Sequence, residues 1–233
     1  MDKKYTYEDF LKIMETLLGE GGCPWDREQT HETLRQYVIE EAYETVEAIN
    51  NDDMKNLCEE LGDLLLQIVF HAEIERKKGG FTMDDVVDGI SRKMINRHTH
   101  IFGSDKADTP QEVTLTWEAN KKAEKGYKTQ TDVLRGVAKS LPALTRATKV
   151  VTKAHTDGFN EEHLKEAMDS IKAETEEAVS LDYDKEEMER KIGDILLKTS
   201  ILSAIFKINP EFALTKSTEK FINRFERYET GRY

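Results

Sequence analysis

Internal repetition is the feature that most constrains this chain, because three short blocks occur twice in the same order. EExxE at Glu40 to Glu44 is matched by ExxE at Glu174 to Glu177, CEELGDLLL by ERKIGDILL, and KMINRH by KFINRF. One such match would carry little weight, but three in register indicate a tandem duplication. We therefore expect two units of similar fold, residues 1–126 and 127–233, joined within the polar stretch between Lys121 and Asp132.

Apolar residues in the first unit follow helical spacing. The longest run with i, i+3, i+4 spacing comprises Leu57, Leu61, Leu64, Leu65, Ile68, Val69 and Ala72. A partner helix is expected from about Thr30 to Ile49, with Asn50 to Asp53 as the turn, and a third from Met83 to Arg97, opened by a Thr82 cap. The chain has only four Pro and 13 Gly, and no alternating apolar pattern is long enough for a strand. The sequence predicts an all-α fold.

Composition narrows the function and the location. The net charge of -12 disfavours nucleic acid as a partner. The mean hydropathy of -0.66 and the short apolar runs disfavour a membrane protein. The first residues show no apolar signal core, so we expect a cytoplasmic protein. An apolar share of 38% makes a thin core unless helices pair across a subunit interface.

Two acidic strings carry the candidate chemistry. Glu40, Glu41 and Glu44 fall within one arc of a helix, and Glu59, Glu60 and Asp63 have the same spacing on the next helix. Antiparallel pairing of the two helices would bring both sets together, and such crowding persists only if cations or protons compensate it. An all-oxygen site suits Mg²⁺. The competing interpretation, a solvated acidic surface, is the usual one for a single EExxE string.

A glycine inside the second acidic string favours the metal site. Gly62 costs about 1 kcal/mol relative to Ala in a helix interior, yet it recurs as Gly193. We expect another backbone or a ligand to approach closely there.

The chain resembles the MazG family of nucleoside triphosphate pyrophosphohydrolases over essentially its whole length. The matching strings are GCPWDREQTHETL, IEEAYE, EELGDLLLQIVFHAE and RHTHIF. The resemblance implies an all-α bundle completed by formation of a homodimer. It also implies Mg²⁺-dependent hydrolysis of nucleoside triphosphates to the monophosphate and pyrophosphate, for which removal of noncanonical nucleotides is one role to consider. Its implied metal ligands are Glu41, Glu44, Glu60 and Asp63, with Glu40 in the outer shell or orienting the attacking water.

Basic and aromatic residues would complete a nucleotide site. Lys93 and Arg97 lie one turn apart on a predicted helix and would grip phosphates; the KxINR string recurs in the second half, which favours this over a solvated basic face. Trp117 and Lys121 match a family stretch near the nucleotide. Trp117 would stack on a base or pack in the core. Tyr37, one turn before Glu41, has the same two alternatives.

The histidines give weaker evidence for a functional site than the acidic strings do. His98 and His100 could indicate zinc, but the matching family segment favours a structural or phosphate-contacting role. His31 and His71 are far apart in sequence, and we expect each to be an isolated structural residue.

The second half departs from the family pattern. Ala173 replaces the first Glu of EExxE, and Lys191 stands where ExxD requires Glu, three residues before Asp194. An ammonium about 5 Å from a divalent ion costs roughly 6–7 kcal/mol at an effective dielectric near 20, unless Lys191 swings away or loses its proton. We therefore expect the active site in the first half. The second half would be a weakened copy, or Lys191 would grip phosphate itself.

Two other functions compete. A non-catalytic nucleotide-binding regulatory module would use the same acids and bases without a correctly placed water. A di-iron bundle would also use helix-borne acids. Glu-x-x-His pairs are typical of di-iron sites, and neither acidic string contains one.

Overall fold

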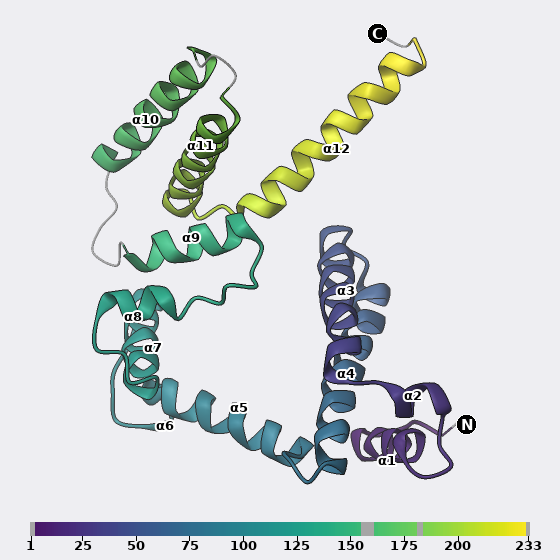
Figure 1. The fold of residues 1–233 in the computed structure, drawn as a ribbon. Helices are drawn as coiled ribbons and strands as arrows, with labels where there is room; N and C mark the ends of the chain where they lie inside the picture. Colours follow the sequence, from purple (N-terminus) through teal and green to yellow (C-terminus); the bar gives the residue numbers. More distant parts are fainter. Residues whose placement is uncertain (1–2, 155–160, 181–183, 232–233) are drawn as a thin grey trace. The chain divides into compact units, whose positions relative to one another are not determined.

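The structure is a computed structural model that describes residues 3–154, 161–180 and 184–231. Every regular element in these ranges is a helix, so the all-α prediction is confirmed for the described residues (Figure 1). The chain divides into two compact units, Met1–Trp117 and Glu118–Tyr233. Helix α7 (Pro110–Glu124) spans this division, which therefore falls before the join expected from the sequence.

The first unit is built on a long helical hairpin. Its α3 and α4 lie side by side, α1 and α5 pack against α4, and α2 and α6 are short (Figure 1). The helices are α1 (Tyr7–Leu18), α2 (Pro24–Glu28), α3 (His31–Asn50), α4 (Met54–Lys77), α5 (Met83–Arg97) and α6 (Thr99–Phe102), followed by the first part of α7. The three helices predicted for this unit are confirmed.

Side-chain caps fix where these helices begin. Thr82 accepts a hydrogen bond from the Asp85 backbone N–H, and Asp85 accepts one from the Thr82 backbone N–H at 2.7 Å, a reciprocal capping box at the start of α5. Asp53 caps α4 by accepting from two backbone N–H groups of its first turn. The tight turn before it includes Asp52 in the left-handed region, at φ 55°.

The buried core of the first unit occupies the end of the hairpin that lies far from this turn. It consists of Met14, Leu18, Leu34, Val69, Phe70 and Ile74. Large apolar side chains towards the turn remain exposed instead, namely Ile39, Tyr43, Ile49, Met54, Leu61 and Ile68. The core is therefore thin where the acidic strings lie.

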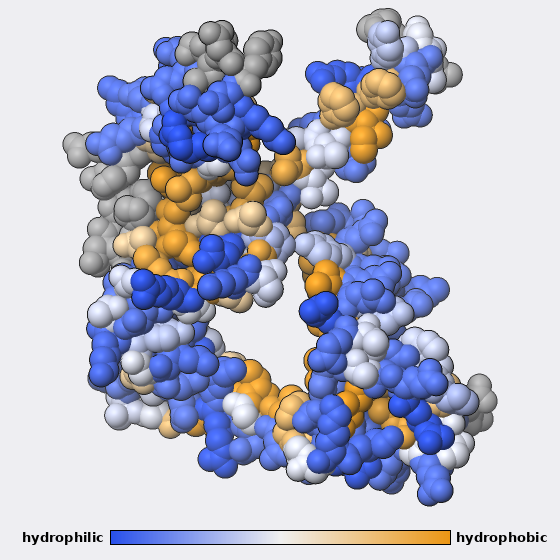
Figure 2. All heavy atoms as spheres, viewed as in Figure 1, coloured by the Kyte–Doolittle hydropathy of each residue, from blue (hydrophilic) through white to orange (hydrophobic). Residues whose placement is uncertain are grey.

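The second unit contains a similar hairpin. Its helices are the rest of α7, α8 (Gln130–Arg135), α9 (Ala143–Ala154), α10 (Glu161–Ser180), α11 (Lys185–Ile205) and α12 (Pro210–Glu229). Helices α10 and α11 pack together, and α9 packs against α11. Figure 2 shows apolar side chains along α12, where the exposed residues are Leu214, Phe221, Ile222, Phe225 and Tyr228. None of the described helices is both long and apolar enough to cross a membrane.

Candidate functional site

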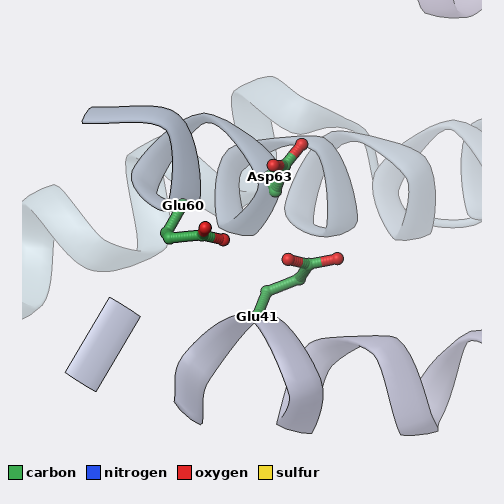
Figure 3. A group of neighbouring side chains, drawn as sticks. All are labelled: Glu41, Glu60 and Asp63. Atoms are coloured by element: carbon green, nitrogen blue, oxygen red, sulfur yellow. The ribbon is translucent and has the colours of Figure 1, made fainter. Parts of the chain in front are cut away.

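Three carboxylates converge between α3 and α4. Glu41 extends from α3 towards Glu60 and Asp63 on α4 (Figure 3). One oxygen from each side chain lies within 4.8 Å of the others, the spacing of ligands around one cation. In the described part of the chain this acidic cluster could bind a metal, as the spacing of the two strings predicted.

The cluster is electrostatically strained. Burial raises the pKa of Glu41, and the charges of Asp63, Glu44 and Glu60 raise it further. The pKa of Glu60, which is 8% exposed, is raised by burial and then by Glu44 and Asp63. Every cause recorded for these two groups acts upwards, so the cluster favours a proton or a cation.

The other two predicted acids lie beside this cluster. Glu44, one turn after Glu41, is exposed, and its proximity contributes to raising the pKa of Glu60. Glu40 is exposed at the side of the cluster and adds to the upward shift of the Glu41 pKa. The structure thus brings all five acids to one end of the α3–α4 hairpin.

The basic residues lie on α5. Arg97 is only 5% exposed and has its guanidinium carbon 5.1 Å from the centre of the Trp117 ring. The His98 ring meets the same indole edge-on at 5.0 Å, and His100 lies against His98. Lys93, one turn before Arg97, is half-buried. Trp117 therefore packs against both Arg97 and His98.

The two remaining predicted nucleotide residues lie elsewhere. Tyr37 is half-buried on α3, with its ring edge-on to Trp25 at 6.5 Å, and it packs against the core. Lys121 belongs to the second unit, where its Nζ lies 3.9 Å from Glu118.

The expectation of a close backbone approach at Gly62 is wrong within the described chain. A Cβ placed on Gly62 would meet no described atom within 4 Å, and the same holds for Gly193. Open space surrounds both positions, so the only approach that would explain Gly62 comes from a ligand or a second chain.

The prediction that His31 and His71 are isolated is also wrong. Their Nδ1 atoms lie 2.7 Å apart, and the His31 Nε2 lies 2.7 Å from a Glu75 carboxylate oxygen. Burial lowers the pKa of His71, and so does the charge of His31. One signal could have found this pair: both residues are equally far from Asn51, so an antiparallel hairpin places them at the same level.

Comparison with known proteins decides the family. The family model described as the MazG nucleotide pyrophosphohydrolase domain matches residues 29–102. The "Nucleoside triphosphate pyrophosphohydrolase/pyrophosphatase MazG" of Thermotoga maritima is 41% identical over 225 residues, covering 96% of this chain and 85% of that protein. The chain belongs to the MazG family.

Two further relatives show how widely the MazG similarity extends. The "Nucleoside triphosphate pyrophosphohydrolase" of Escherichia coli K12 is 38% identical over 224 residues, covering 94% of this chain and 85% of that protein. The "Uncharacterized protein YabN" of Bacillus subtilis is 41% identical over 228 residues, covering 97% of this chain but 46% of that protein. The predicted resemblance is confirmed, and the match to the MazG domain contains the acidic cluster and Arg97.

Proposed function

We propose that this chain hydrolyses nucleoside triphosphates to nucleoside monophosphates and pyrophosphate, with Mg²⁺ held by Glu41, Glu44, Glu60 and Asp63. The observation that carries the proposal is the convergence of three carboxylate oxygens from α3 and α4 within 4.8 Å. The names of the MazG relatives from Thermotoga maritima and Escherichia coli support the reaction. Removal of noncanonical nucleotides is one role this reaction allows.

The donor set fits magnesium. All the converging groups are carboxylates, which are hard oxygen ligands, and the described cluster includes neither His nor Cys. The pKa values of Glu41 and Glu60 are raised, first by burial and then by the negative charge of neighbouring acids. A bound cation would stabilise the ionised form of both groups.

The residues divide the chemistry between them. Magnesium bound at the cluster would polarise the phosphoryl oxygens and make a water molecule more acidic. Glu40 orients the attacking water by accepting a hydrogen bond from it. Lys93 and Arg97 bind the phosphates and stabilise the charge that develops as the α–β anhydride bond breaks. If water attacks the α-phosphorus, pyrophosphate departs with the bridging oxygen and the water oxygen ends in the monophosphate. If water attacks the β-phosphorus, the monophosphate departs with the bridging oxygen and the water oxygen ends in the pyrophosphate.

Three further residues would contact the nucleotide. Tyr37 lies one turn before Glu41 on α3, and Trp117 lies beside Arg97. Both are aromatic residues that could contact a base with the part of the ring left uncovered by Arg97 and His98 at Trp117, and by Trp25 and the core at Tyr37. Lys121, one turn after Trp117 on α7, stays a prediction from the sequence as a nucleotide-binding residue.

A product assay tests this proposal. Wild-type protein is incubated with ribo- and deoxyribonucleoside triphosphates, with Mg²⁺ or with a chelator, and pyrophosphate and phosphate are measured separately. We expect pyrophosphate only with Mg²⁺, and its loss in Glu41→Gln. The matched control is Glu47→Gln, the same change at an exposed position of α3. Binding without turnover would instead favour the regulatory module, and release of single phosphate would contradict the assigned bond. Water labelled with heavy oxygen identifies the phosphorus attacked.

We also propose that the working form is a homodimer. Exposed apolar residues line α3 and α4 around the acidic cluster, including Tyr43 and Leu61. Covering this face with a second chain would remove apolar surface from water and shield the acids from solvent.

A further inference from the structure

Helix α11 of the second unit repeats α4 of the first residue by residue from its cap. Asp184 caps α11 by accepting from two backbone N–H groups, as Asp53 does at the start of α4. Counting from these equivalent caps, Lys191 takes the place of Glu60, and Lys198 takes the place of Gln67. Two positions in the acidic region have thus become lysine.

Both lysines turn towards the acids of α10. The Lys191 ammonium donates to Glu174 at 2.7 Å and also to Glu177, the counterparts of Glu41 and Glu44. The Lys198 ammonium donates to the other Glu174 oxygen at 2.7 Å. Both oxygens of Glu174 are therefore engaged by ammonium groups. Lys191 is only 6% exposed, so this contact lies inside the α10–α11 packing.

The last acid of the motif is also engaged. Asp194, which corresponds to Asp63, accepts a hydrogen bond from Arg190 at 3.2 Å. In the described residues, the acids that meet at ligand spacing are those of the first unit. The acids of the second unit are therefore paired with basic side chains of the same chain.

The charge environment is opposite in the two hairpins. Hydrogen bonds from Lys191 and then from Lys198 lower the pKa of Glu174 to about 2. The pKa of Lys191 is raised, first by its hydrogen bond to Glu174. Lys191 thus points towards the acids of α10, and its ammonium group lies between Glu174 and Glu177.

We propose that Lys191 and Lys198 replace the divalent cation in the second unit, so that each chain has one metal centre and one lysine-neutralised copy of it. Two single positive charges stand where the first unit would hold one double charge. This inference rests on the proposed function, which locates the metal centre in the first unit. The second unit would then keep its hairpin closed without metal.

An ordinary surface ion pair is the competing explanation, and the geometry disfavours it. Surface pairs hold exposed, flexible side chains and contribute little to stability. Lys191 is instead buried at a position where its counterpart is a buried acid, Glu60. Gln67, the counterpart of Lys198, is also buried, and its Oε1 has no hydrogen-bond partner among the described residues. The second unit therefore has an ammonium group at both positions, where the first unit has an acid, Glu60, and an uncharged amide, Gln67.

Mn²⁺ binding to the full chain tests the proposal, measured by loss of the paramagnetic resonance signal of the free ion. The background is Glu60→Gln/Asp63→Asn, which removes the first centre. To it we add Lys191→Glu/Lys198→Gln, which restores the residues of the first unit. We expect no tight binding in the background and a gain on the order of 10-fold in affinity on restoration. The matched control, Lys185→Glu/Lys172→Gln, makes the same charge change at exposed positions and is expected to show no gain.

The outcomes separate the two proposals. If the background retains the wild-type stoichiometry of Mn²⁺, the metal centre of the proposed function is wrong, while the restored variant still reports on the second unit. Two results would overturn the lysine replacement: equal Mn²⁺ binding with and without restoration in folded protein, or an equal gain in the charge control. Should the restored variant fail to fold, Lys191→Gln is added to the Glu60→Gln/Asp63→Asn background and measured by thermal unfolding. We then expect the Tm of this variant to rise with Mn²⁺ while that of the background stays unchanged, and a flat response would contradict the proposal.

Discussion

The guanidinium of Arg97 lies over the face of Trp117, with 5.1 Å between the guanidinium carbon and the ring centre. Such a contact is worth about 1 kcal/mol where it is partly desolvated. If the indole orients Arg97 for phosphate binding, Trp117→Leu should raise KM for a triphosphate about 5-fold and change kcat little. Trp117→Phe should retain most of the affinity, because it keeps an aromatic face. Steady-state kinetics decide this, and an unchanged KM in Trp117→Leu would show that other contacts orient Arg97.

The two units should respond differently to one substitution. Asp63→Asn removes a proposed metal ligand, and we expect pyrophosphate release to fall by about 100-fold or more, since even outer-shell partners cost 10–100-fold. Asp194→Asn makes the same change at the equivalent position and should leave turnover within about 2-fold. Side-by-side assays at saturating Mg²⁺ compare them. Loss of activity in Asp194→Asn alone would show that the assignment of the active half is reversed.

Because open space surrounds Gly62, we expect Gly62→Ala to raise the stability of the chain and to lower its activity. Ala should stabilise the helix by about 1 kcal/mol, which raises the Tm of the free chain by roughly 2–4 °C. We expect Gly62→Ala to lower turnover as well, because a ligand or second chain would approach this position. Gly193→Ala, the same change in the second unit, should give the stability without the loss. Thermal unfolding and kinetics measure both, and equal activity in the two variants would remove the functional reason for Gly62.

In the metal-free protein, the contribution of Glu41 and Glu60 to stability should increase as the pH falls from neutral. The pKa values of Glu41 and Glu60 lie above the ordinary 4.5. A carboxyl group with a raised folded-state pKa stabilises the fold below 4.5 and loses that contribution as the pH rises through the folded value. In a chelator, Glu41→Gln should therefore have the higher Tm at about pH 8, and the difference should vanish towards pH 4.5. A difference that grows in acid would contradict the crowding of these acids. Excess Mg²⁺ should make the wild type the more stable protein at neutral pH.

The exposed apolar face of α3 and α4 predicts self-association. Sedimentation at micromolar concentration should detect a two-chain species, and Leu61→Glu should convert it to single chains, because a buried charge is costly at an interface. Leu115→Glu, at an exposed position of α7, serves as the control. A stable, fully helical single chain in the wild type would show that this face remains open.

The α3–α4 hairpin and the meeting of its acidic residues could be predicted from the sequence, because both depend on regular residue spacing. The apolar periodicity from Leu57 to Ala72 and the Asp53 cap define α4, and two helices joined by a short turn must run antiparallel. Glu41 and Glu60 lie at similar distances from that turn, so their meeting follows from chain geometry.

What the sequence could not supply depends on side-chain direction and on contacts across long separations. The register of the hairpin places His31 and His71 at the same level, but the stacking of their rings depends on the direction of each side chain. The burial of Arg97 against Trp117 requires the chain to return after α6. Lys191 had several accessible directions, and only the packing of α10 on α11 selects the one that meets Glu174.

A metal ion exchanges with its surroundings, so its occupancy follows its concentration. Lys191 is covalently attached to the helix that it neutralises, and its local concentration is therefore fixed by the chain. If both proposals hold, scarcity of magnesium would stop catalysis in the first unit and leave the second unit folded. One chain would then join an activity that depends on magnesium supply to a scaffold that does not.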